Sequence, residues 1–247
     1  MRIKTFKSIL FVCTIIFLAA CSGEVTHKND FDVIISNGVV YDGSGEEPAL
    51  IDIGIKGALI SQMGDLSEFT ANENIDASGL AVAPGLINML SWATQPLIVD
   101  GRALSDIKQG VTLEVMGEGR SMGPLNDKMK ANEKRRQSNI KFDIEWTTLN
   151  EYLEYIVNKG VSVNVASYVG ATTIRVHEIG YEDREPTNEE LLRMQELVRQ
   201  AMRDGALGVG SSLIYTPANF AKTDELIALV RAAAEFNGGY ISHLRSE

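Results

Sequence analysis

Residues 187–214 read TNEELLRMQELVRQAMRDGALGVGSSLI, and this stretch decides the fold class. Thr187 and Glu190 match the capping box that begins a helix, and Gly205 takes the position that follows one. An apolar strand is predicted directly afterwards, over residues 206–214, and a helix that leads into a buried strand is typical of a parallel sheet. A single apolar stripe predicts that the helix covers a core on one side only. The stripe consists of Leu191, Met194, Val198 and Ala201.

The same alternation continues on both sides of this stretch. Thr148 with Glu151 matches a second capping box, and Thr223 offers a plain N-cap for a third helix. Gly160 and Gly238 take the positions after these helices. We therefore expect an α/β fold with parallel strands in succession. The strands are predicted at residues 86–90, 111–116, 161–169, 206–214 and 239–242.

Two architectures produce such alternation, the doubly wound sheet and the β/α barrel. No glycine-rich phosphate turn follows the first strand, and Gly208 and Gly210 lie inside a strand, where they favour close packing. Polar residues gather where the predicted strands end, which is where β/α barrels carry out chemistry. The sequence therefore predicts a partial TIM barrel that stops after its fifth strand. These polar residues are Ser91, Trp92, Glu118, Arg120, Tyr168, Thr172, Ser211, Ser212, Tyr215, His243 and Arg245.

Before the barrel, residues 31–83 read as short strands separated by turns, and we expect them to form part of a small β-sandwich. The barrel segment then covers residues 84–247. The predicted strands are residues 31–36, 39–41, 51–56, 58–63 and 80–83.

The N-terminus has the features of a secretory signal. Arg2, Lys4 and Lys7 precede an apolar run over residues 9–20, which is too short to span a bilayer as a helix. LAAC, ending at Cys21, resembles the lipobox of bacterial lipoproteins. We expect residues 1–20 to be a lipoprotein signal peptide, Cys21 to be acylated, and residues 21–30 to be a tether to a membrane outside the cytoplasm. An ordinary cleaved signal is the alternative.

Charge and cysteine content exclude several functions. The net charge is -10, so nucleic acid is not expected as a partner. Cys13 and Cys21 are the two cysteines of the chain, and the body of the chain therefore has no internal disulfide and no thiolate metal site. Any bound metal must be held by His, Asp or Glu.

Several motifs resemble the amidohydrolase superfamily. FDVIISNGVVYDG at residues 31–43 and IDASGLAVAPGLIN at residues 75–88 are similar to its opening. REPTNEEL at 184–191, GALGVGSSLIY at 205–215 and YISHLRSE at 240–247 resemble the N-acyl-D-amino-acid deacylase branch. The resemblance implies a β-sandwich joined to a metal-dependent TIM barrel that hydrolyses the amide bond of N-acylated D-amino acids. It also implies a protein about twice this long, so that the present chain is an N-terminal fragment.

The chain departs from the family pattern at two places. The family's first barrel strand ends Asp-x-His-x-His, whereas this chain has Asn88, Leu90 and Trp92, so one metal site is expected to be absent. The family's metal-bridging Cys, within Gly-Asn-Cys-Gly, falls on Gly119. Glu118, one residue earlier, could supply a carboxylate in its place.

The remaining site residues follow from the resemblance. His243 matches the ligand His after the fifth strand, although a lone His at a strand end can also be a packed core residue. The implied cofactor is a divalent metal, most simply zinc. Arg245 could clamp a substrate carboxylate or bind a neighbouring loop, and Ser212 and Tyr215 could line the substrate pocket or serve as caps. The catalytic Asp of the family would follow residue 247.

Two functions are compatible with these observations. The first is an enzyme that hydrolyses a linear amide, as N-acyl-D-amino-acid deacylases do, with the fragment alone inactive. The second is a catalytically degenerate lipoprotein that keeps the fold as a binding scaffold, which the loss of the His-x-His positions, now Leu90 and Trp92, motivates.

Overall fold

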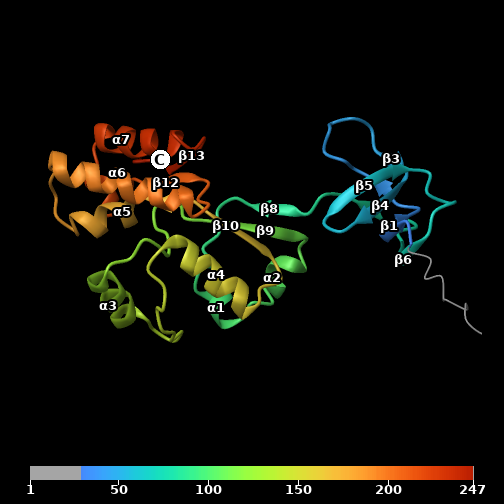
Figure 1. The fold of residues 1–247 in the computed structure, drawn as a ribbon, viewed down its shortest axis with the longest axis horizontal. Helices are drawn as coiled ribbons and strands as arrows, with labels where there is room; N and C mark the ends of the chain where they lie inside the picture. The colour runs from blue at the N-terminus through green and yellow to red at the C-terminus, as the bar shows by residue number, and fades with distance from the viewer. Residues whose placement is uncertain (1–28, 247) are drawn as a thin grey trace, which may run out of the picture. The chain divides into compact units, whose positions relative to one another are not determined.

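The computed structural model describes residues 29–246, which form two units, one ending at Pro84 and one beginning at Gly85 (Figure 1). The predicted signal peptide and Cys21 lie outside the described residues. Within the described part of the chain, no helix combines the length and the apolar character needed to cross a bilayer.

The first unit contains two β-sheets. In one sheet the order is β5-β4-β1-β6, with β1 antiparallel to β4 and parallel to β6, and in the other it is β3-β2-β7. β3 and β6 were not predicted from the sequence. The Asn- and Glu-rich β6 has low strand propensity and forms through its pairing with β1, and β3 is only two residues long. The strands are β1 (Phe31–Ser36), β2 (Val39–Val40), β3 (Ala49–Leu50), β4 (Asp52–Lys56), β5 (Leu59–Gly64), β6 (Ala71–Asp76) and β7 (Ala81–Val82).

The second unit is a run of parallel strands alternating with helices. Its two three-stranded ladders have the orders β10-β9-β8 and β11-β12-β13, and every pairing in them is parallel. The predicted third strand is divided at Tyr168 into β10 and β11. The result is an α/β partial barrel whose strands do not close within residues 29–246. The strands are β8 (Leu86–Asn88), β9 (Val111–Met116), β10 (Asn164–Ser167), β11 (Val169–Gly170), β12 (Gly208–Ser212) and β13 (Gly239–His243).

Two of the three helix starts predicted from the sequence are correct. The capping boxes at Thr148 and Thr187 are both formed. The predicted cap at Thr223 is wrong, because Lys222 is the N-cap residue and Thr223 is already helical. α5 was missed, since its β-branched residues disfavour a helix locally and its burial outweighs that preference. The helices are α1 (Pro96–Val99), α2 (Leu104–Ile107), α3 (Asp127–Arg136), α4 (Leu149–Lys159), α5 (Ala171–Glu178), α6 (Asn188–Arg203), η1 (Ala218–Phe220) and α7 (Thr223–Ala234).

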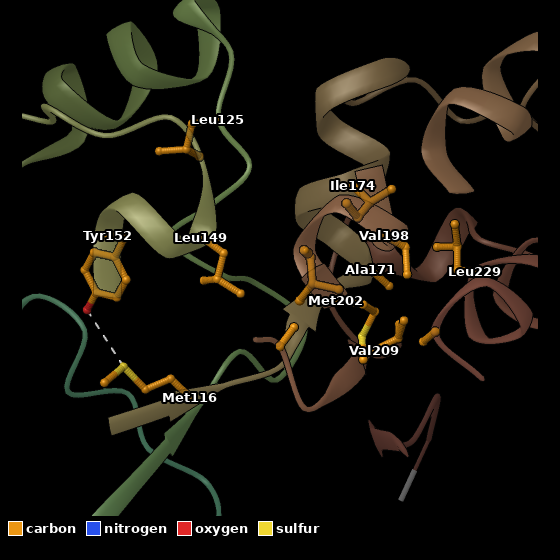
Figure 2. Close-up of a cluster of buried hydrophobic side chains, with 14 of the residues drawn as sticks. Met116, Leu125, Leu149, Tyr152, Ala171, Ile174, Val198, Met202, Val209 and Leu229 are labelled. Carbon is orange, nitrogen blue, oxygen red and sulfur yellow. Dashed lines mark hydrogen bonds between the residues drawn. The ribbon is translucent and has the colours of Figure 1, made fainter. Parts of the chain in front are cut away.

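The core of the second unit lies between its strands and helices. Helices α5, α6 and α7 pack side by side, and Val198 of α6 and Leu229 of α7 are fully buried around Val209 of β12 (Figure 2). A neighbouring part of the same core holds Met116 of β9 against Tyr152 of α4, whose hydroxyl donates to the sulfur at 3.8 Å (Figure 2). This packing holds the carboxyl ends of β9, β12 and β13 in place.

Candidate metal and substrate site

The loop after β9 depends on glycine. Gly117 and Gly119 have φ values of 95° and 74°, a region that favours glycine. A Cβ on Gly210 of β12 would lie 2.4 Å from the carbonyl oxygen of Gly117, so the close approach of this loop to β12 requires glycine there. This confirms the prediction that the glycines of residues 208–211 lie in a strand and allow close packing. This approach carries Glu118 over the end of β12.

Glu118 meets His243 at the carboxyl ends of their strands. Oε1 of Glu118 lies 3.9 Å from Nδ1 of His243, and the Ser212 hydroxyl donates to Oε2 of Glu118 at 3.5 Å. Ser212 is opposite His243 in the β12–β13 register, which brings both to the same edge. The ring of Tyr215 makes an edge contact with His243, with centroids 5.5 Å apart. The structure therefore brings four of the predicted site residues together.

Arg245 uses its guanidinium for a loop contact. Its two terminal nitrogens donate to the carbonyl oxygens of Asn219 and Ala221 at 2.8 and 2.9 Å. This is the neighbouring-loop alternative of the sequence analysis, and it fixes the turn around η1. The clamping of a substrate carboxylate by Arg245 stays a prediction.

The end of β8 carries no metal ligand. The amide nitrogen of Asn88 donates to Oε2 of Glu114 at 3.0 Å, and Leu90 and Trp92 are exposed. Among residues 29–246, no cluster of three or more His, Cys, Asp or Glu side chains is placed to hold a metal ion. His243 and Glu118 are thus two donors that need others to complete a site. Two donors on one tetrahedral zinc ion, with bonds of about 2.0–2.2 Å, lie about 3.4 Å apart. The 3.9 Å between Glu118 and His243 would therefore shorten by a few tenths of an ångström when the ion binds.

A cavity of about 350 Å³ opens beside the same strand ends. Its lining includes Trp92, Gly117, Arg120 and Thr172, together with Met129 of α3 and apolar side chains of residues 140–144. Trp92, Arg120 and Thr172 were predicted from the sequence to lie at strand ends, with Trp92 at a position where the family has a ligand His. The cavity itself was missed because its walls come from segments far apart in the chain, and no local pattern reports such an enclosure.

Comparison with known proteins identifies consistent relatives. No family model matches the sequence. D-aminoacylase of Alcaligenes xylosoxydans xylosoxydans is 32% identical over 221 residues, which cover 88% of this chain and 45% of that protein. N-acyl-D-aspartate deacylase of the same organism is 32% identical over 225 residues, covering 87% and 44%. The chain thus spans about half the length of these relatives.

Solved structures agree with the sequence relatives. A crystal structure of D-aminoacylase, described as defining a novel subset of amidohydrolases, matches with a TM-score of 0.77 and 32% identity, covering 88% of this chain and 46% of that one. Another structure of D-aminoacylase, with the same TM-score of 0.77, concerns a binuclear metal centre with one-metal activation and second-metal attenuation. N-acyl-D-glutamate deacylase from Bordetella bronchiseptica, complexed with zinc and a phosphonate inhibitor, matches with a TM-score of 0.74 and 28% identity, covering 88% and 46%. The sequence identity and the shared fold make the chain similar to D-aminoacylase and to the subset of amidohydrolases that it defines, over about half of the length of that protein.

Proposed function

We propose that the whole protein hydrolyses the amide bond of an N-acylated D-amino acid. The observation that carries the proposal is the meeting of Glu118 and His243, 3.9 Å apart at the carboxyl ends of β9 and β13, in a fold shared with D-aminoacylase. The carboxyl end of the strands is where barrel enzymes place their chemistry. The relatives that share this fold act on N-acyl-D-amino acids, as their names state.

We propose a divalent metal, zinc first, as the cofactor. Imidazole nitrogen and carboxylate oxygen are donors that zinc accepts, so His243 and Glu118 fit as part of its ligand set. When bound, the metal would polarise the amide carbonyl and lower the pKa of a water molecule toward about 7. The loss of ligands at Leu90 and Trp92 is compatible with activity, because a D-aminoacylase structure is described in terms of one-metal activation.

The chain's own residues have distinct proposed roles. Ser212 holds the Glu118 carboxylate in position through its hydrogen bond. Tyr215, which packs on the His243 ring and is otherwise exposed, can contact substrate directly. Arg245 orders the loop around η1 and keeps its remaining donors for a substrate carboxylate. The proton-transferring carboxylate is expected in the part of the family pattern that follows residue 247.

The test combines metal content with turnover in the whole protein. Wild type should bind zinc and release an amino acid from N-acetyl-D-amino acids, whereas Glu118→Gln and His243→Asn should each lower zinc affinity at least about tenfold, because each removes a direct ligand. Glu154→Gln, an exposed change on α4, is the matched control and should match wild type. Unchanged zinc binding in both site variants, or wild type without turnover, contradicts the proposal.

A second candidate function is a binding protein that has lost catalysis. It is favoured by Asn88, Leu90 and Trp92 in place of the family's Asp-x-His-x-His. Calorimetry with N-acetyl-D-amino acids, followed by analysis of the recovered ligand, separates the two functions. Intact ligand after prolonged incubation with zinc-loaded protein supports the binding protein, and cleaved ligand supports the enzyme.

We further propose that Cys21 is acylated and anchors the protein to a membrane outside the cytoplasm. The support is the LAAC sequence after a basic and apolar N-terminus. Cys21→Ala should move the protein from the membrane fraction to the soluble fraction. Mass spectrometry of the wild type should detect a lipid on Cys21. A membrane-bound Cys21→Ala variant contradicts the anchor.

A further inference from the structure

We infer that the cavity beside α3 receives the apolar acyl chain of the substrate, an inference that rests on the proposed hydrolase function. The cavity has a volume of about 350 Å³, within the range of about 300–1,000 Å³ that is typical of small-molecule sites. It lies entirely within the second unit. No step of the function proposed above uses it.

One side of the cavity adjoins the candidate reaction centre. Gly117 and Arg120 both line it, and Glu118 lies between them in the chain. Trp92, which follows β8, and Thr172, which follows β11, complete the same side. Glu118 and His243 are not themselves in the lining, and we place the carbonyl that they would hold at this side of the cavity, so that the chain attached to it passes inside.

The interior is suited to hydrocarbon. Leu125 and Met129 are 5% and 9% exposed, and residues 140–144 add Ile140, Phe142 and Ile144. Burying a methylene group against such side chains is favourable, whereas a charged group would lose its hydration.

Four polar residues of the lining, Ser121, Thr173, Arg120 and Glu133, already have partners. The hydroxyl of Ser121 donates to the carbonyl of Gly123 and accepts from the amide of Gly170, and its backbone amide donates to Thr173. Arg120 and Glu133 pair with each other at 3.8 Å, with side chains 39% and 36% exposed. The wall that contains Leu125, Met129 and residues 140–144 is therefore the part of the cavity that suits an acyl chain.

We expect kcat/KM to depend on the length of the substrate's acyl chain. N-acetyl-, N-butyryl- and N-octanoyl-D-leucine share one amino acid, and their kcat/KM should rise roughly fourfold for each added methylene until the cavity is full. Ile140→Trp should shorten the preferred chain, because the larger ring fills the cavity. Ile140→Ala should extend it. Leu192→Trp adds the same ring to an exposed position of α6 outside the lining and should leave the series unchanged.

Two readouts separate this inference from the function on which it rests. Calorimetric binding of N-octanoyl-D-leucine, measured without turnover, should weaken at least about tenfold in Ile140→Trp and not in Leu192→Trp. Length-dependent binding without hydrolysis would support the cavity and contradict the hydrolase. Hydrolysis with the same length dependence in Ile140→Trp and wild type would support the hydrolase and overturn the acyl pocket.

Discussion

The side-chain amide of Asn88 donates to Oε2 of Glu114 at 3.0 Å, at the position where the family's first barrel strand has Asp. Glu114 is 1% exposed, and its other oxygen has no hydrogen-bond partner among residues 29–246. An amide can donate to this buried carboxylate, whereas a second carboxylate could not unless one of the two kept a proton. Asn88, which stands where the family has Asp, therefore supplies the hydrogen-bond donor that the buried Glu114 carboxylate needs.

Asn88→Asp should destabilise the protein by roughly 1–3 kcal/mol near neutral pH, because it replaces the donor with a second acidic group. Urea unfolding near neutral pH measures the effect. Asn139→Asp, on an exposed loop, is the control, and equal effects of the two changes would contradict the coupling.

Restoring the family Cys at Gly119 should fail for a steric reason. A Cβ there would lie 2.2 Å from the Ser212 hydroxyl, and the φ of 74° adds strain. Gly110 has a similar φ of 83° with open space around it, so Gly110→Cys should lose only about 1–2 kcal/mol for the backbone conformation.

Gly119→Cys should lose roughly 1–3 kcal/mol more than Gly110→Cys in chemical unfolding. Adding Ser212→Gly should recover part of that excess. If the two single variants have the same stability, the contact with Ser212 does not restrict the loop.

The buried ion pair between α5 and α7 predicts a large and pH-dependent effect. Arg175 donates to Glu225 at 2.5 Å, with side chains 1% and 3% exposed. Burial raises the pKa of the Glu225 carboxyl, and Arg175 opposes that rise. Arg175→Met should cost about 3–5 kcal/mol near neutral pH, because it leaves a buried charge unpaired.

The same variant should recover stability in acid. A carboxyl with a raised pKa in the folded state is most costly above that pKa, and the cost disappears as the pH falls through it. Urea unfolding of Arg175→Met at about pH 7.5 and about pH 5.5 should therefore show a smaller loss at the lower value. Adding Glu225→Gln should recover stability at the higher pH, and a pH-independent loss would contradict the account.

The N-terminus of α6 holds a carboxyl whose pKa is shifted in the opposite direction to that of Glu225. Hydrogen bonds from Arg184, at 2.7 and 2.8 Å, and from the Thr187 amide lower the pKa of Glu190 to about 2. A carboxyl with a lowered pKa stabilises the fold fully above its usual pKa and loses that contribution as the pH falls. Glu190→Gln should therefore lower the thermal midpoint at neutral pH, and the difference from wild type should narrow below about pH 5. Glu154→Gln should show no such trend.

Sequence alone determined the features that rest on local signals. The capping boxes at Thr148 and Thr187 and the strand at residues 111–116 were predicted correctly, because capping and apolar runs act over a few residues. The sequence also predicts that His243 lies at the end of a strand, as it does in β13. It shows directly that Leu90 and Trp92 replace two ligand histidines of the family pattern. The family was recognisable from motif order for the same reason.

Only the tertiary structure decided which of these residues meet. Glu118 and His243 are distant in sequence, and their contact depends on the close approach of Gly117 to Gly210, which no local pattern encodes. The loop contact of Arg245 and the helix α5 likewise arise from packing between distant segments. Long-range packing selects among local preferences. Many of the helices and strands could therefore be predicted from the sequence, whereas the geometry of the site could not.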